Sequence, residues 1–89
     1  MTTHEPQGLT FPCLYAVKAM GLAQGDFDAL VVSIVRGHIS DIAEGAISSR
    51  PSANGKYISV TVEVEVASRA QLEAIYTALR AHERVLMTL

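Results

Sequence analysis

Apolar and polar side chains alternate without a break in the segment Lys56-Tyr57-Ile58-Ser59-Val60-Thr61-Val62-Glu63-Val64-Glu65-Val66-Ala67. A period of two is typical of a β-strand with one face buried and the other in water. Burying each of the five aliphatic side chains on the apolar face contributes roughly 1.5–3 kcal/mol before conformational entropy is counted. We therefore expect this strand to lie in the centre of a sheet.

The segment that precedes this strand is expected to form a hairpin with it. Ser52-Ala53-Asn54-Gly55 is a strong turn signal, and residues 42–50 are a plausible strand before the turn. Pro51 favours an edge position for that strand. A two-residue loop pairs Ile47 with Val62, and a four-residue loop pairs it with the valine two positions earlier. Both registers keep Ile47 on the valine face, whereas a three-residue loop would turn it to solvent.

Two helices are predicted from apolar side chains at spacings of three and four residues. The first follows Asp26, a candidate N-cap, and ends near Gly37. The second follows Ser68, a candidate N-cap of the same kind. Helices in these two places separate the hairpin from the strands at either end of the chain.

The two outer strands complete the pattern. Residues 11–21 form a short segment bounded by Pro and Gly, and its alternation turns Lys18 to the face in water. Residues 84–89 are expected to form the last strand, with Val85, Met87 and Leu89 on the buried face.

The order strand, helix, strand, strand, helix, strand is the βαββαβ unit of α+β ferredoxin-like folds. Right-handed crossovers place both helices on one face of a four-stranded antiparallel sheet, which gives a two-layer sandwich with strand order 4-1-3-2. The opposite sheet face is then open. We expect it to carry Lys18, Met20, Tyr57, Ser59, Thr61, Glu63, Glu65, Leu86 and Thr88.

The sequence has 89 residues, a net charge of −2 and a single cysteine, Cys13. This length fits one domain, which we place at residues 11–89 after a flexible N-terminal tail at residues 1–10. One cysteine excludes an internal disulfide, and the slightly acidic charge favours neither nucleic acid nor an anionic membrane as a partner. Because the sequence contains neither a signal peptide nor a run of about 20 apolar residues, we expect a cytoplasmic protein.

The residue types that carry chemistry are sparse. Cys13 and the histidines His4, His38 and His82 show no spacing typical of a nucleophile with its base or of a metal centre. RNA-recognition modules share the predicted topology but need aromatic platforms and a basic surface. The predicted central strand offers one tyrosine and two glutamates instead. We expect a protein that is not an enzyme, has no cofactor or metal and binds no nucleic acid.

Several motifs resemble those of the YbeD-like family, and the resemblance extends from about Phe11 to the end of the chain. It implies a bacterial cytosolic protein with an ACT-like ferredoxin fold. ACT-like domains bind small effectors, often amino acids, and regulate an attached or partner enzyme. Family members are described as of unknown function or as proposed lipoate regulators. The motifs are Phe11-Pro12, Lys18 with Met20-Gly21, Arg50-Pro51-Ser52-Ala53-Asn54-Gly55-Lys56-Tyr57-Ile58-Ser59-Val60 and Val85-Leu86-Met87-Thr88-Leu89.

The connection after the first strand is where an ACT-like domain would hold a small effector. Backbone N–H groups at a helix N-terminus favour anions, but the negative Asp26 argues against a phosphate there. An amino group or a neutral ligand fits better, and a plain connecting loop is the alternative. The predicted effector-binding residues are Gly21, Gln24, Gly25 and Asp26.

The hairpin and the open sheet face form a second candidate region, for a protein partner. A cation there can make a charge-assisted contact with a partner's carboxylate, and a solvent-exposed turn is the alternative. The predicted partner-binding residues are Lys18, Arg50, Ser52, Lys56 and Tyr57. The open face can also pair with itself, Lys18 of one copy with Glu63 or Glu65 of another, so a homodimer is possible.

These observations predict a non-catalytic regulatory module that binds a protein partner, a small effector or both. The alternative is a structural homo-oligomer or assembly subunit without a ligand.

Overall fold

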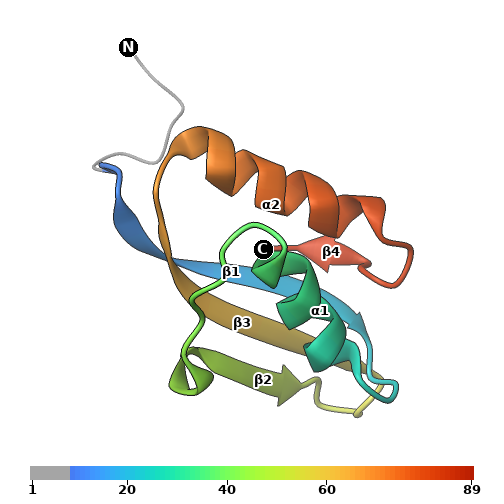
Figure 1. The fold of residues 1–89 in the computed structure, drawn as a ribbon. Coiled ribbons are helices and arrows are strands. Elements are labelled where there is room, and N and C mark those ends of the chain that lie inside the picture. The colour runs from blue at the N-terminus through green and yellow to red at the C-terminus, as the bar shows by residue number, and fades with distance from the viewer. Residues whose placement is uncertain (1–8) are drawn as a thin grey trace.

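A computed structural model of the chain describes residues 9–89 (Figure 1). Its elements are β1 (Cys13–Leu22), α1 (Phe27–Arg36), a 3₁₀ turn η1 (Glu44–Ala46), β2 (Ile47–Pro51), β3 (Tyr57–Val66), α2 (Arg69–Ala81) and β4 (Met87–Thr88). Most of the expected N-terminal tail, residues 1–8, lies outside the described residues. Leu9 is partly buried and packs against the core.

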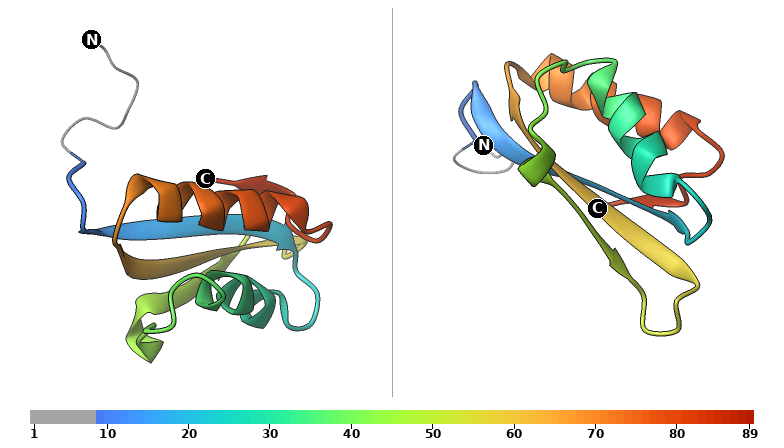
Figure 2. Two further views of the ribbon diagram at one scale, coloured as in Figure 1. Left: turned by 45° about the horizontal axis from the view of Figure 1, so that its top comes forward. Right: turned by 60° about the horizontal axis from the view of Figure 1, so that its bottom comes forward.

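The four strands form one antiparallel sheet in the order β2-β3-β1-β4. This confirms the predicted order 4-1-3-2 and the α+β ferredoxin-like fold. Figure 2 shows both helices on the same side of the sheet. No other described segment covers the opposite side, which we call the open face. The side under the helices is called the covered face.

The core lies between the covered face and the two helices. Val60, Val62 and Val66 of β3 have no exposed surface, and Phe27 of α1 is 1% exposed. Ile75 of α2 is also fully buried. The apolar side of β3 therefore packs against the apolar sides of α1 and α2 in one layer, as the spacing of apolar residues in the sequence predicts.

The hairpin adopts the register of a two-residue loop, because Ile47 pairs with Val62. The turn is closed by a hydrogen bond from the Gly55 N–H to the Ser52 carbonyl at 2.9 Å. Gly55 has φ +76°, a left-handed conformation that glycine adopts without a Cβ penalty. The edge position predicted for Pro51 is confirmed.

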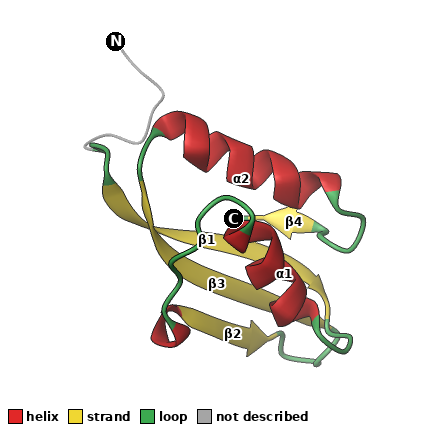
Figure 3. Ribbon diagram, in the orientation of Figure 1, coloured by secondary structure: helices red, strands yellow, loops and turns green. Residues whose placement is uncertain are grey.

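Strand β2 is shorter than predicted, because the chain does not extend until Ile47. Residues Glu44–Ala46 instead form the 3₁₀ turn (Figure 3), with the Ala46 N–H donating to the Ala43 carbonyl at 3.0 Å. The backbone groups of this segment are satisfied locally, so no strand partner is needed before Ile47.

The prediction for the last strand is wrong in its phase. Met87 pairs with Met20 and Thr88 with Ala19, so Met87 lies on the open face and Thr88 on the covered face. The reason is a turn in which the Val85 N–H donates to the His82 carbonyl at 3.0 Å. Val85 is buried as part of that turn, and the strand alternation begins only after it.

The helix caps differ from each other. Ser68 caps α2 as predicted, its side chain accepting from the Gln71 N–H at 3.1 Å. Asp26 occupies the N-cap position of α1, but its side chain makes no capping hydrogen bond. The predicted N-cap position is therefore confirmed but the expected capping bond is not, and the Asp26 carboxylate accepts from Arg84 instead.

Candidate functional site

The open face is built by the strand residues that alternate with the core. The pairing register arranges them in rows across the sheet. Met20 lies level with Ser59 and Arg50, and Lys18 lies level with Thr61 and Ser48. The other end of β3 carries Glu63 and Glu65, which pair with Ala16 and Leu14 of β1. The open-face residues thus run from a basic end to an acidic end along the strands.

The basic end of the open face is hollowed. A depression of about 390 Å³ is lined by Lys18, Ser48, Ser49, Arg50, Ser59, Thr61 and Leu89. Strands β1, β2 and β3 all contribute to it. The two cations lie in adjacent rows of the sheet, Lys18 on β1 and Arg50 on β2. Arg50 also borders a smaller hollow of about 130 Å³ beside Met20 and Tyr57.

Among residues 9–89, the two cations of this depression have no counter-charge. The one ion pair recorded among residues 9–89 joins Arg84 to Asp26, and no side-chain hydrogen bond within the same residues involves the Lys18 ammonium or the Arg50 guanidinium. Hydroxyl groups of Ser48, Ser59 and Thr61 surround them. Two cations and several hydroxyl donors around one hollow favour an anion, and a guanidinium matches a planar carboxylate best.

The rest of the open face combines acidic and apolar side chains. Glu63 and Glu65 are exposed. Leu14 is 77% exposed, Met87 52% and Leu89 54%. These apolar side chains lie toward both ends of the face, Leu14 in the row of Glu65 and Met87 in the row of Met20.

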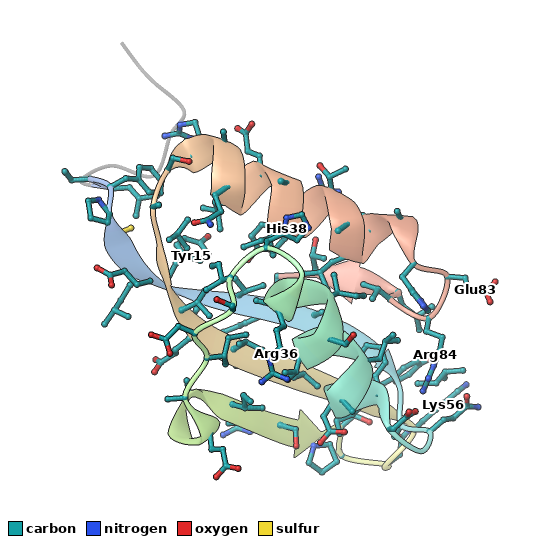
Figure 4. The ribbon with its side chains drawn as sticks, in the orientation of Figure 1. Tyr15, Arg36, His38, Lys56, Glu83 and Arg84 are labelled. Carbon is teal, nitrogen blue, oxygen red and sulfur yellow. The ribbon has the colours of Figure 1, made fainter. Side chains whose placement is uncertain are left out.

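The predicted effector loop is held by Arg84 (Figure 4). One guanidinium nitrogen donates to the Asp26 carboxylate at 3.2 Å, and the other donates to the Gln24 carbonyl at 2.9 Å. The hydrogen bond from Arg84, together with a local backbone hydrogen bond, lowers the pKa of Asp26 below its ordinary value of 3.8. The loop carboxylate that was expected to meet an effector therefore already has a partner.

Gly21 of the predicted effector site serves packing. A Cβ at this position would lie 2.5 Å from both the Arg84 carbonyl oxygen and a carbon of the Phe27 ring. The absence of a side chain lets the segment before β4 approach β1. Gly25 has φ +48° and open space around it, so it supplies the turn into α1.

The hairpin residues have separate roles. The Ser52 hydroxyl accepts from the Tyr57 N–H at 3.0 Å and donates to the Asn54 side chain at 2.9 Å. The Lys56 ammonium lies 5.4 Å from the centre of the Tyr57 ring, a cation–π contact. Of the predicted partner-binding residues, the structure brings Lys18 and Arg50 together at one hollow, whereas Ser52 and Lys56 belong to the turn.

Sequence reasoning missed the roles of four residues of these regions. Arg84 is separated from Asp26 by 58 positions, and no local pattern links them. Met87 and Leu89 were placed on the wrong face, because the turn at Val85 shifts the alternation by one residue. Ser48 was hidden by the weak pattern of the edge strand.

The described residues also bear on metal binding and on membrane insertion. Within residues 9–89, no three His, Cys, Asp or Glu side chains lie close enough together to hold a metal ion. No helix in the same part of the chain has the length and apolar character needed to cross a membrane.

Comparison with known proteins supports a family assignment. A family described as "Protein of unknown function (DUF493)" matches residues 6–89. A UPF0250 protein of Neisseria gonorrhoeae is 40% identical over 81 residues, covering 91% of this chain and 89% of the relative. A UPF0250 protein of Nitrosomonas europaea is 37% identical over 85 residues, covering 96% and 98%.

A solved structure shares the fold. The solution structure of protein HP0495 from H. pylori superposes with a TM-score of 0.69 at 18% sequence identity, covering 99% of this chain and 98% of that one. At this identity the similarity concerns the fold.

Proposed function

The chain belongs to the DUF493 (UPF0250) family of proteins of unknown function, the family that its YbeD-like motifs indicated, and on that premise we propose a non-catalytic regulatory module of the bacterial cytoplasm. Its open face receives a carboxylate at the basic hollow. The carboxylate belongs to a small effector or to an acidic segment of a protein partner.

The observation that carries this proposal is the pair of cations at the hollow. Lys18 and Arg50 line the same depression of about 390 Å³, a volume within the range of ligand sites, roughly 300–1,000 Å³. The loop at Gly21–Asp26 remains a predicted effector site, but its carboxylate is paired with Arg84. The open face therefore offers charges that a ligand can neutralise without first breaking an internal contact.

We propose different roles for the two cations. A guanidinium presents parallel N–H donors that bind both oxygens of a carboxylate, so Arg50 fixes the ligand's orientation. The Lys18 ammonium supplies a compact positive charge beside it. Lys18 lies on the central strand β1, which is paired on both sides. The sheet therefore holds the backbone of Lys18 in place before a ligand binds.

Family resemblance bears on the choice of ligands. Members are described as proposed lipoate regulators, and ACT-like domains commonly bind amino acids. Both ligand classes contain a carboxylate. We therefore include amino acids, lipoate and octanoate among the candidate effectors.

The proposal is tested by a thermal-shift screen with those carboxylates and with an acidic oligoglutamate peptide, followed by calorimetric titration of any ligand found. A ligand at 100 times its Kd stabilises the protein by about 2.7 kcal/mol, which raises the Tm by about 10 °C or more in a domain of this size. The small acids and the peptide distinguish an effector from a protein segment as the source of the carboxylate.

Two variants connect the result to the hollow. Arg50→Gln and Lys18→Gln should each weaken binding at least about tenfold, since each removes a charge-assisted contact. Lys56→Gln is the matched control and should bind as the wild type does. The proposal is overturned if no carboxylate or acidic peptide binds, or if binding survives both substitutions in the hollow.

A second candidate function is a structural homo-oligomer. The specific observation that favours it is the set of exposed aliphatic side chains on the open face, among them Leu14 and Met87.

A further inference from the structure

The open face carries opposite charges at the two ends of the same strands. Lys18 and Arg50 occupy two adjacent rows at one end, and Glu63 and Glu65 occupy the next two rows toward the other end. Leu14 lies in the outermost acidic row, level with Glu65. A face with this arrangement is complementary to its own copy turned end for end.

One symmetry operation brings these ends together. A two-fold axis in the plane between two facing sheets, perpendicular to the strands, reverses the order of the rows and keeps each strand over its own copy. We place this axis between the Lys18 row and the Glu63 row. From this geometry we propose that the open face binds a second copy of the chain in an isologous, face-to-face homodimer.

The rows then match one by one. Lys18 of one copy lies over the row of Glu63 in the other, and the Arg50 row lies over the row of Glu65. Each charge pair is offset sideways by one strand, about 4.8 Å, which long side chains span. All four pairs form at once, because a two-fold axis repeats each contact.

The apolar side chains follow the same operation. The row of Leu14 in one copy falls over the row of Met20 and Met87 in the other. Leu14 is 77% exposed and Met87 52% exposed in the single chain, so the pairing removes exposed apolar surface from water. Apolar contact and ion pairing therefore favour the same orientation.

The competing orientation is disfavoured by charge. An axis parallel to the strands would place the basic end of one copy over the basic end of the other. Like charges brought together at an interface repel each other and oppose association. The charge pattern thus selects one of the two simple ways to stack the sheets.

The area of the face sets the expected strength. Strands β1 and β3 have ten residues each. At about 3.3 Å per residue and 4.8 Å per strand, three strand widths present on the order of 500 Å² per copy. The total of about 1,000 Å² is near the lower limit for a specific interface, so we expect a dimer that dissociates in the micromolar range.

The test is sedimentation equilibrium of the full chain, whose mass is 9.5 kDa, over a range of concentrations at low and high salt. The wild type should approach twice that mass at high concentration, with weaker association in about 0.5 M salt because ion pairs are screened. Lys18→Glu alone and Glu63→Lys alone should each raise the dimer Kd at least about tenfold, because each places like charges opposite each other.

Mixing the two charge-reversed variants provides the decisive result. In the mixed dimer every reversed charge meets its complement, so Lys18→Glu and Glu63→Lys should associate with each other as tightly as the wild type self-associates. The double variant Lys18→Glu/Glu63→Lys should also self-associate. Circular dichroism confirms that each variant is folded, and Glu73→Lys on the exposed side of α2 is the charge-matched control.

Three outcomes overturn the inference. They are a wild type that remains monomeric up to about 1 mM at low salt, single variants that dimerise like the wild type, and a mixture of the two variants that does not associate. Lys18 and Arg50 serve both proposals, so a carboxylate ligand and a second copy compete for the hollow. The three outcomes are measured without ligand, so this inference and the carboxylate site fail separately, whereas the homo-oligomer named as second candidate function fails with this inference.

Discussion

The two faces of strand β3 have opposite properties although their residues are neighbours in the chain. Val62 is completely buried under the helices, whereas Glu63 and Glu65 are exposed on the open face. Side chains on the covered face are held in place by close packing, whereas the charged side chains on the open face remain in contact with water. Stability is therefore concentrated on one side of the sheet, and the recognition that we propose takes place on the other.

The separation has a practical consequence for mutagenesis. Side chains on the open face can change charge or size without disturbing the core, because their neighbours are water and flexible side chains. Side chains on the covered face are surrounded by the packed atoms of α1 and α2. Substitutions of similar size on the two faces should then differ sharply in their effect on unfolding.

The largest effect is expected when the covered face loses volume. Ile75→Ala removes a fully buried side chain and should lower the free energy of unfolding by about 2–5 kcal/mol. A domain of this length has only about 4–13 kcal/mol in total. Leu14→Ala on the open face should change it by less than about 0.5 kcal/mol. Urea denaturation at low protein concentration measures both, and equal losses would contradict the separation of the faces.

A smaller loss should follow when the covered face gains volume. Gly21→Ala introduces a methyl group against the Arg84 carbonyl oxygen and the Phe27 ring, which should cost about 1–3 kcal/mol. Gly45→Ala adds the same group where nothing lies within 4 Å and should be neutral or slightly stabilising. Thermal unfolding of the two variants compares them directly. A stable Gly21→Ala variant would show that the close approach of Arg84 is not required.

Two opposite substitutions in neighbouring residues of β3 compare the faces at nearly constant side-chain volume. Val62→Thr buries a hydroxyl group in an apolar layer and should cost about 1–3 kcal/mol. Thr61→Val on the open face should stay within about 0.5 kcal/mol of the wild type. The two changes are nearly equal in volume, so polarity alone separates them. Similar unfolding midpoints in urea would show that β3 is not one-sided.

The smallest effect concerns Tyr76, at the margin of the covered face. Its hydroxyl donates to the Leu89 carbonyl at 3.1 Å, and its ring meets the Tyr15 ring edge-on at 6.4 Å between centres. Burial, followed by the nearby Tyr15, raises the pKa of Tyr76 to about 12 from its ordinary value of 10.0.

The raised value determines how stability changes with pH. The folded state holds the Tyr76 proton more tightly than the unfolded state, so the contribution is complete below pH 10 and is lost as the pH rises toward 12. The phenolate absorbance is titrated with pH in the wild type and in Tyr76→Phe. The difference between the two curves reports Tyr76 and should have its midpoint near pH 12. A midpoint near 10 would mean that the Tyr76 hydroxyl is in water.

Most of the architecture was predictable from local patterns. The alternation in β3 and the turn at Asn54-Gly55 limited the hairpin to two registers, both with Ile47 on the valine face, and the structure has Ile47 opposite Val62. Ser68 marked the start of α2. These features depend on residues close together in the chain, where spacing and chemistry carry the information.

The candidate site was predicted in part. Lys18 and Arg50 were expected at the partner surface, and the structure adds that they line one hollow. The roles of Gly21 and Asp26 were not predictable, since they depend on Arg84, which comes from the far end of the chain. A capping aspartate and an ion-paired aspartate have the same local sequence.

By itself, the sequence determined the order of elements, the buried face of β3 and the edge position of β2, because side-chain period and turn chemistry act over a few residues. Tertiary structure alone decided the phase of β4, the partner of Asp26 and the hollow shared by three strands. Met87 faces outward because β4 pairs with β1 only after the chain has turned at Val85. Contacts between distant segments settle such choices, and no local pattern records them.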